Sequence, residues 1–584
     1  MPHSAPVPPT GFQALILCGP GVSLNTFTSN PEEFPKALIP VANRPMVWYV
    51  LDFCYRMGIN NITLITPHSS QAPLEAALSQ NPHLTSLPSP SPSVLAPSDL
   101  TLTTGTAELL RLPEVQACIK SDFLLLPCDL ICDISGESLL EAWMVSQGAF
   151  GGSTLAGGWN TNGPKTVGMG GEAGGRRGGL AVYYQTKGRE ESVKGEVTDF
   201  VATAPLEQDE APAVSHPADG PAALRFGLSK LVLSMPMDTA QEKMEEDKGL
   251  LIRHSLVKKH AKVKMLTSYR DAHLYVFPYW VKEFAHVNEK FESVSEDIVG
   301  WWAKTDWQVG LGEKLRLNEI FQQSHRVGES GSLDDESIEE EIDIKAMSTT
   351  KAGAGESCDS SLPEAPTEFQ FASRVKSSGI DSGIEPPHKE NLAIPPVLAY
   401  MHSSLPSAPL IRRVDTSTLL LSVSLHLAKL ESIEEAGRVA ASPFAHNQKV
   451  AESAGVAQRC TVTKSDCLLA HNVTVEEKCV IKESVIGTNC HIASGARLTR
   501  CLIMDGAVIG ERCQLTGCIV GRRSKVGREC VLKDCEVQDG NVVEDQTDAK
   551  NEKFMMFEGL DDDADAEGID VSEDFGEDGS DLGF

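Results

Sequence analysis

The sequence predicts an α/β domain with a parallel sheet, followed by a β-solenoid. Two patterns carry this prediction: apolar runs alternate with helical patterns between residues 11 and 128, and aliphatic residues recur in hexads between residues 469 and 537. Strands that alternate with helices are typical of a parallel sheet with helical crossovers. Hexads build short coils that stack into a solenoid. A chain of 584 residues is long enough for both domains and for polar linkers.

The elements of the α/β domain follow from apolar spacing and turn residues. Residues 12–18 form an apolar run, with Gln13 as its one polar residue, that ends at Gly19, which predicts a buried strand and a turn. Residues 45–57 begin with proline and carry apolar side chains at helical spacing, which predicts a helix. Further strands are predicted at 62–65 and 122–128.

Stretches without apolar periodicity divide the chain. Runs rich in Pro, Ser, Gly or Ala at 87–97, 148–179 and 202–223 are predicted to be surface loops. The predicted organisation is a leader at 1–10, a first domain at 11–323, a disordered Ser/acidic insertion at 324–391, the end of the first domain and a connector at 392–450, a left-handed β-helix at 451–545 and a disordered acidic tail at 546–584. A helix at 425–436 is expected to lead into the β-helix.

The β-helix prediction depends on one column of aliphatic residues. Steps of six, six and five close every 17 residues, and all 13 positions are Leu, Ile or Val in a chain with 41% hydrophobic residues. The positions are Leu469, Val475, Ile481, Ile486, Ile492, Leu498, Ile503, Ile509, Leu515, Val520, Val526, Leu532 and Val537. Stacked coils would bury this column. Because neighbouring strand residues face opposite sides, Leu502→Asp is expected to destabilise the β-helix less than Ile503→Asp.

Cysteines follow the same repeat. One ladder contains Cys467, Ser484, Cys501, Cys518 and Cys535, and a second contains Cys479, Ala496, Cys513 and Cys530. Small residues replace Cys in both ladders, and the sequence lacks the paired C-x-x-C spacing of zinc sites, so we expect structural thiols and no metal site. The odd total of 15 Cys and the lack of a signal peptide predict free thiols in a reducing compartment.

Composition argues against two classes of partner. The net charge is −30, with acidic residues concentrated at 329–343 and after Lys553, whereas nonspecific nucleic-acid binding needs a basic surface. The sequence contains no apolar run long enough to cross a bilayer. We therefore expect a cytosolic protein that binds other proteins, with no nucleic acid and no membrane as partner.

The stretch after the first strand carries candidate site residues. It reads ALILCGPGVSLNTFTSNPEEFPKALIPVANRPMVWYVLDF and resembles the signature of sugar nucleotidyltransferases, in which L-A-G-G-x-G-T-R-L precedes P-K-x-L-x-P-V. The resemblance implies a Rossmann-like, nucleotidyltransferase-like fold. It also implies that N–H groups at Gly19 and Gly21 would face nucleotide phosphates, that Lys36 would position the triphosphate and that Asp129 would hold Mg²⁺.

The loop departs from that signature. Pro20 replaces a glycine and removes a backbone donor, and no arginine precedes Lys36 to stabilise developing charge. Asp415, in RRVDTSTLL, lies roughly where the family has D-x-G-T-P, but the glycine is absent. We therefore expect a vestigial nucleotide pocket with no catalytic residue, no metal and no cofactor. Its residues are Gly19, Gly21, Lys36 and Asp129.

A nucleotidyltransferase-like domain joined to a hexapeptide β-helix occurs in sugar-phosphate guanylyl- and adenylyltransferases and in two subunits of eukaryotic translation initiation factor 2B. The chain resembles the gamma-subunit family of that factor, in its fungal form. The passages are LCGPGVSLNTFT, FPKALIPVANRPMVWYVLDFC, DFLLLPCDLICDI, LIRHSLVKKHAKVKMLTSYRDAHLYVF, the connector AY…LIRRVDT, and SVSEDIVGWWAK, which resembles an acidic-helix segment. The epsilon subunit has a further helical domain, which is not expected here because an acidic tail follows Val543 closely.

The resemblance implies a subunit without chemistry of its own. In that family the epsilon subunit exchanges GDP for GTP on translation initiation factor 2. The gamma subunit pairs with epsilon, supports the exchange, and joins alpha, beta and delta subunits in a larger complex. These partners are expectations from the resemblance alone.

Two other functions stay open at the level of the sequence. One is a sugar-nucleotide pyrophosphorylase that acts on mannose-1-phosphate or glucose-1-phosphate with Mg²⁺, and the missing loop arginine argues against it. The other is a hexapeptide acyltransferase with His471 or His491 as general base, for which the sequence offers no acyl-CoA feature.

Overall fold

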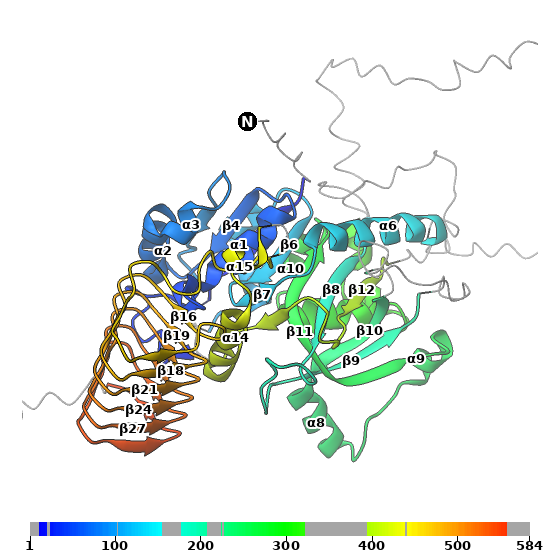
Figure 1. Cartoon of the computed structure of the whole chain (residues 1–584). Helices are drawn as coiled ribbons and strands as arrows, with labels where there is room; N and C mark the ends of the chain where they lie inside the picture. Colours follow the sequence, from blue (N-terminus) through cyan, green and yellow to red (C-terminus); the bar gives the residue numbers. More distant parts are fainter. Residues whose placement is uncertain are drawn as a thin grey trace, which may run out of the picture.

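The computed structural model describes residues 11–19, 24–101, 103–154, 177–206, 224, 227–321, 394–438 and 441–556. The predicted leader, the insertion at 324–391 and Gly21 lie outside these residues. The tail predicted at 546–584 begins too early, because the strands Asp548–Lys550 and Lys553–Phe554 still belong to the β-helix. Residues 557–584 lie outside the described residues. Figure 1 shows an α/β domain beside a β-helix. Within the described residues, no helix combines the length and hydrophobicity needed to cross a membrane.

A nine-stranded mixed sheet forms the centre of the α/β domain. Its strands, in spatial order, are β5 (Ser93–Leu95), β4 (Asn61–Ile65), β1 (Gln13–Leu17), β6 (Phe123–Pro127), β11 (Lys264–Phe277), β8 (Gly179–Gln185), β12 (Val397–Met401), β10 (Leu228–Pro236) and β9 (Asp199–Ala204). The strands from β5 to β6 are parallel, as the βαβ pattern predicts, and β11 then pairs antiparallel with β6. The parallel strands therefore form the part of the sheet next to residues 18–35, which follow β1 and which we call the signature loop.

Helices and short strands surround this sheet. They are η2 (Lys36–Leu38), β2 (Pro40–Val41), β3 (Arg44–Pro45), α1 (Met46–Arg56), α2 (His68–Gln80), α3 (Pro82–Thr85), α4 (Thr106–Leu109), α5 (Pro113–Cys118), β7 (Leu130–Cys132), α6 (Gly136–Thr154), α8 (Met237–Glu246), α9 (His254–Lys259), α10 (Val281–Val287), η4 (Val294–Val299), α11 (Gly300–Thr305), α12 (Leu311–Lys314), β13 (Ile411–Arg413), α14 (Ser417–Lys429) and α15 (Ile433–Ala436). Alternate residues of β6 enter different apolar clusters, Leu124 and Leu126 on one face and Phe123 and Leu125 on the other. The sheet is thus buried on both faces.

The predicted helix at 45–57 is confirmed as α1. Gly58 ends it with φ of 75°, and the Ile59 N–H donates back to the Cys54 carbonyl at 3.0 Å. A left-handed residue just past the last turn is the usual glycine stop of a helix.

Four expectations about loops and the connector differ from the structure. The 87–97 run contains β5, which pairs with β4. The 148–179 run begins inside α6 and ends at the first residue of β8, and the 202–223 run begins inside β9. The helix expected at 425–436 is two helices, α14 and α15, because Ser432 and Glu435 form a capping box that starts a new helix.

The β-helix consists of three parallel sheets. The first is β16 (Leu468–Leu469), β19 (Val485–Ile486), β22 (Leu502–Ile503), β25 (Ile519–Val520), β28 (Glu536–Val537) and β31 (Lys553–Phe554); the second is β14 (Gly455–Val456), β17 (Thr474–Val475), β20 (His491–Ile492), β23 (Val508–Ile509), β26 (Lys525–Val526) and β29 (Val542–Val543); the third is β15 (Thr461–Val462), β18 (Val480–Lys482), β21 (Arg497–Thr499), β24 (Gln514–Thr516), β27 (Val531–Lys533) and β30 (Asp548–Lys550). The predicted left-handed hexapeptide architecture is confirmed, and all 13 column residues are buried in one cluster.

The cysteine ladders are confirmed as structural. Cys501 and Cys518 are buried next to the column, and Ser484 takes the equivalent place one coil earlier. Ladder thiols contact carbonyl oxygens of the next coil: the Cys513 sulfur lies 2.8 Å from the Gly527 carbonyl oxygen, and the Cys530 sulfur 3.0 Å from that of Glu544. A small side chain with a weak donor suits this position.

The outward face of the first β-helix sheet packs against the α/β domain. Leu468, Val485, Leu502 and Ile519 belong to the same buried cluster as α1 and α14. Leu502 is therefore only 1% exposed. The smaller destabilisation expected for a charge at Leu502 assumed that this side chain is exposed. That assumption is wrong, because the outward side of the strand faces a second domain and not water.

Candidate functional site

Lys36 and Asp129 meet at the carboxyl ends of the parallel strands. Asp129 directly follows β6, and Lys36 begins η2 after the signature loop. The Lys36 Nζ lies 2.6 Å from Asp129 Oδ2, and the Asp129 side chain is 1% exposed. Gly19 follows β1 at the same edge, and no neighbouring atom lies within 4 Å of the place where a Cβ would stand on it. Of the predicted pocket residues, Gly21 lies outside the described residues.

A third residue, Arg413, completes the contacts of Asp129. Its Nε lies 3.2 Å from Oδ1 and its Nη2 lies 3.2 Å from Oδ2. Arg413 reaches the carboxylate because β13 pairs antiparallel with β7, which places Arg413 opposite Leu130. Both oxygens of Asp129 thus accept hydrogen bonds from cations, in the bidentate geometry that favours arginine.

These charges fix the protonation of the group. Burial would raise the pKa of the Asp129 carboxyl, but Arg413 and Lys36 outweigh burial and hold that pKa well below its ordinary value. Burial likewise lowers the pKa of Arg413, and the charges of Asp129 and Asp415 raise it by more. Asp129 is therefore an anion held between two cations.

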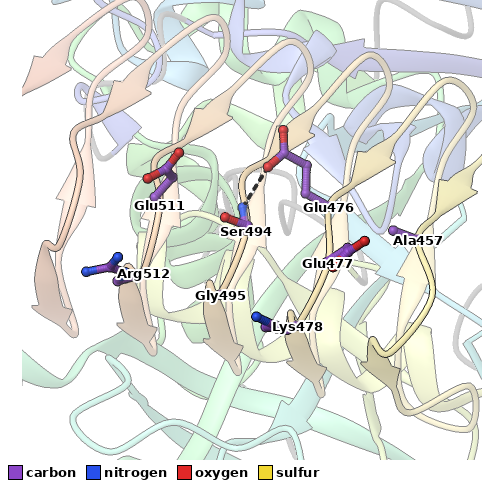
Figure 2. A pocket seen from close by; sticks show the side chains of 8 residues that line it. All are labelled: Ala457, Glu476, Glu477, Lys478, Ser494, Gly495, Glu511 and Arg512. Carbon is purple, nitrogen blue, oxygen red and sulfur yellow. Dashed lines mark hydrogen bonds between the residues drawn. The ribbon is translucent and has the colours of Figure 1, made fainter.

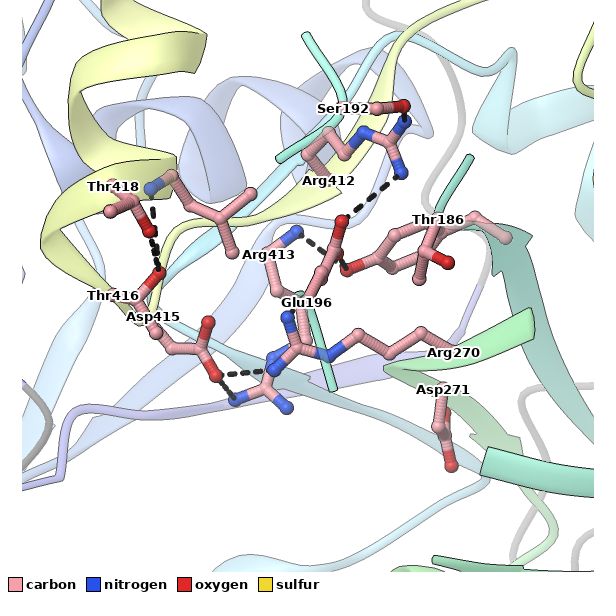
Figure 3. Close-up of polar contacts among 12 residues, drawn as sticks. Thr186, Ser192, Glu196, Arg270, Asp271, Arg412, Arg413, Asp415, Thr416 and Thr418 are labelled. Carbon is pink, nitrogen blue, oxygen red and sulfur yellow. Dashed lines mark hydrogen bonds and ion pairs between the residues drawn. The ribbon is translucent and has the colours of Figure 1, made fainter. Parts of the chain in front are cut away.

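The network continues to Asp415 and beyond (Figure 3). Arg270 on β11 donates through Nη2 to Asp415 Oδ2 at 2.5 Å, and its Nη1 lies 3.4 Å from Glu196 Oε1. Glu196, which is 1% exposed, also accepts from the Tyr184 hydroxyl at 2.9 Å. The Arg412 Nη1 lies 3.9 Å from Glu196 Oε2. Each of these carboxylates faces at least one arginine.

This arrangement is poorly suited to a divalent cation. Mg²⁺ binds through carboxylate oxygens that are free to approach it. Asp129 and Asp415, the two candidate metal ligands, already pair with arginine or lysine. Among the described residues, no group of three or more His, Cys, Asp or Glu side chains is arranged to hold a metal. The residues present do not fit the Mg²⁺ that the sequence resemblance implies.

Sequence reasoning found Lys36, Asp129 and Asp415 but missed their arginine partners. The motif RRVDT contains Arg412 and Arg413 directly beside Asp415. The sequence therefore showed two adjacent basic residues in a buried-strand pattern. It did not show that Arg413 contacts Asp129, which lies 284 positions earlier in the chain.

The signature loop is also attached to the β-helix. The Thr26 hydroxyl donates to Glu536 Oε2 at 3.1 Å, and Ser417 of α14 donates to the other oxygen of Glu536. The Arg522 guanidinium lies 3.1 Å from the centroid of the Phe34 ring. The loop that would hold phosphates in a transferase thus contacts the last coils of the solenoid.

The β-helix carries a separate shallow pocket of about 540 Å³ (Figure 2). Glu476 Oε2 accepts from the Ser494 N–H at 2.9 Å, and Lys478 and Arg512 line the same pocket. His491 lies 3.2 Å from Glu476 Oε1 with a side chain that is 42% exposed, and His471 contacts the Ser453 hydroxyl at 3.1 Å. The two histidines of the acyltransferase hypothesis therefore have side chains that are at least partly exposed to solvent, and each contacts one polar side chain.

Comparison with known proteins finds a family model and a curated relative that resemble parts of this chain. Residues 445–549 match the family model described as the EIF2B subunit epsilon LbH domain. Translation initiation factor eIF2B subunit gamma of Schizosaccharomyces pombe (strain 972 / ATCC 24843) is 23% identical over 341 residues, which are 58% of this chain and 60% of the relative. The chain thus matches less than two thirds of that relative's length. Both similarities are to proteins described as subunits of translation initiation factor 2B.

Proposed function

We propose that this chain is a gamma-type, non-catalytic subunit of translation initiation factor 2B that acts in the cytosol. In this role it pairs with an epsilon subunit, joins alpha, beta and delta subunits, and supports the exchange of GDP for GTP on initiation factor 2. The observation that carries the non-catalytic part is the pairing of Asp129 with both Lys36 and Arg413. A carboxylate held in this way is a structural ion pair and a poor metal ligand.

The two comparisons name different subunits, and the proposal follows the gamma relative. The epsilon match is confined to residues 445–549, which contain most of the β-helix. The gamma match extends over 341 residues and so includes more than the β-helix. A shared solenoid is weaker support for one subunit than a match that reaches another domain.

The test of this function is to isolate the tagged chain from its native cell and identify the chains that co-purify. The proposal expects an epsilon-type subunit in amounts close to equimolar, with the other subunits in smaller or equal amounts. Recovery of the chain alone, or as a homotrimer, would contradict it. A chain fused to the same tag but carrying Val485→Glu at the domain junction serves as the control for contacts that need the intact fold.

The second candidate function is a sugar-nucleotide pyrophosphorylase, which the match to P-K-x-L-x-P-V at residues 35–41 keeps in consideration. Purified protein with sugar-1-phosphates, each nucleoside triphosphate and Mg²⁺ is expected to release no pyrophosphate above background. Losing one charge-stabilising donor alone costs about 10²–10³ in rate. Turnover that disappears in Asp129→Ala would favour this second function.

A further inference from the structure

The α/β domain carries a basic and apolar surface around α9 that the proposed function does not use. From Lys248 to Arg270 the sequence contains no Asp or Glu, although the net charge of the chain is −30. We define the basic surface by its exposed residues, which are Leu251, Ile252, Arg253, Val257, Lys258, Lys262 and Lys264. Figure 1 shows α9 on the side of the α/β domain away from the β-helix.

The apolar members of the basic surface are strongly exposed. Leu251 is 73% exposed, Val257 58% and Ile252 48%. Single exposed apolar residues are ordinary on protein surfaces, whereas several close together mark a contact site. Here the exposed apolar side chains lie close in sequence to Arg253 and Lys258, so the surface offers both apolar contact and positive charge.

Leu256 and Asp306 hold the segment against the domain, and several of its cations form no ion pair with a described residue. Leu256 is buried in a small cluster with Trp307 and Val232. Asp306 accepts from Lys259 and lies 2.8 Å from both Lys230 Nζ and His260 Nε2. With Asp306 engaged in this way, no other described residue forms an ion pair with Arg253, Lys258, Lys262 or Lys264. These four charges face outward, where an acidic partner would meet them.

This chain contains an acidic segment that matches the basic surface. Residues 329–343 hold eight carboxylates and no Lys or Arg, and Leu333, Ile338 and Ile342 are interspersed among them. The segment thus pairs negative charge with apolar side chains, as the basic surface pairs positive charge with apolar side chains. Opposite charges of this density attract over about a Debye length, roughly 8 Å at physiological salt.

The connection along the chain also favours this segment. Asp306 and Trp307, which hold α9, lie a few residues before α12 in the part of the chain that ends at Phe321. Residue 329 follows Phe321 by eight positions, which span at most about 27 Å when extended. A short tether raises the local concentration of the segment at the surface. The acidic residues after Lys553 follow the β-helix in the sequence, and the β-helix lies on the side of the α/β domain away from α9 (Figure 1).

We infer that residues 329–343 dock on the basic surface around α9 of the same chain. Docking neutralises the unpaired lysines and covers the exposed apolar side chains. An acidic partner that uses this surface would have to displace the segment. The inference concerns α9 and the insertion only, and it stands or falls independently of the proposed function.

Limited proteolysis of the full-length chain tests this inference. A glutamate-specific protease can cut after Glu329, Glu336 and the run 339–341, and the peptides are timed by mass spectrometry. The test variant combines Lys258→Gln, Lys262→Gln and Lys264→Gln, which removes charge without adding cleavage sites. The matched control combines Lys482→Gln, Lys533→Gln and Lys550→Gln, which are exposed lysines on the third β-helix sheet.

The expected result is that cleavage within 329–343 becomes about fivefold faster in the test variant and stays unchanged in the control, because three exposed ion pairs are lost. Salt at 1 M should speed cleavage of the wild-type chain in the same way. Cleavage after Glu558, Glu567 and Glu573 provides an internal reference. Equal rates in all variants would overturn the inference, and a response confined to the reference sites would assign the surface to the tail. Protection that depends on protein concentration would assign it to a second copy.

Amide hydrogen exchange of α9 gives an independent readout. In Glu339→Gln, Glu340→Gln, Glu341→Gln, residues 254–259 should exchange several-fold faster than in the wild-type chain, while exchange of α1 stays the same. Unchanged exchange of α9 would contradict docking even if the proteolysis result agreed with it.

Discussion

At the scale of single residues, Asp129 shows how the neighbours of a side chain determine its use. Its motif position suggests a metal ligand, but the structure surrounds it with Lys36 and Arg413. Lys36 and Asp129 could be found from sequence because they belong to short motifs. Arg413 could not be assigned to Asp129, because the contact depends on the pairing of β13 with β7 across a long stretch of chain.

The ion pairs of Asp129 should be important for stability. In Asp129→Asn, the cations Lys36 and Arg413 would lose their common anion in a site where the carboxylate is 1% exposed. Breaking a buried pair in this way costs about 3–5 kcal/mol. Urea denaturation of wild-type and variant chains measures the loss. The double variant with Arg413→Gln should recover part of it, and a single-variant loss below about 1 kcal/mol would contradict the role assigned to the network.

Asp271 should make stability depend on pH. Burial and the nearby charge of Asp199 raise the pKa of Asp271 to about 7. In the unfolded chain the carboxyl loses its proton near pH 4, roughly three units lower. The contribution of protonated Asp271 is therefore complete below about pH 4 and declines as pH rises to about 7.

The Asp271→Asn variant isolates this effect. The difference in unfolding free energy, wild type minus variant, should fall between pH 4.5 and pH 7 and level off above pH 7. Urea denaturation at several pH values measures it. A difference that is constant or that rises with pH would show that Asp271 is ionised in the folded protein at low pH.

At the scale of elements, the β-helix could be predicted closely, and the connector could not. The hexad column is a repeated pattern, so each coil confirms the register of the next, and the structure continues it to Val543 and Ala549. The break between α14 and α15 depends on a single capping box at Ser432, which the apolar spacing does not reveal. The direction in which Leu502 faces was predictable, but what lies opposite was not.

Two substitutions in β22 separate the column from the junction. Ile503→Asp places a charge inside the column, and Leu502→Asp places one between the domains, so both should destabilise the chain by several kcal/mol, as is typical of buried unpaired charges. Gln514→Asp on the exposed third sheet is the control, with a change within about 0.5 kcal/mol. Thermal and urea denaturation compare the three. A Leu502→Asp protein as stable as the control would show that the domains do not pack through this row.

At the scale of the whole molecule, the two domains form one surface. Asn43 donates to the Ile486 carbonyl at 2.9 Å, and Arg44 donates to the carbonyls of Phe444 and Ala445 at 2.9 and 2.8 Å. Residues from both domains share one buried cluster. These contacts hold the α/β domain and the β-helix in one fixed relative orientation. A fixed orientation favours a partner that binds the outer faces of both domains.

An epsilon-type partner should therefore bind either domain alone more weakly than the whole chain. Two linked surfaces raise avidity by about 10²–10⁴ without new contacts. Titration of the partner with residues 11–438, with residues 441–556 and with the full chain measures the difference, after circular dichroism has established that each piece is folded. Equal affinity of one piece and the full chain would assign the interface to that piece alone.

The exchange reaction itself tests the central claim most directly. The rate of labelled GDP release from initiation factor 2 is measured with an epsilon-type subunit alone and with this chain added in equimolar amount. The account predicts that this chain accelerates release by epsilon and releases no GDP on its own. An unchanged rate, at concentrations where the two subunits bind each other, would contradict the account.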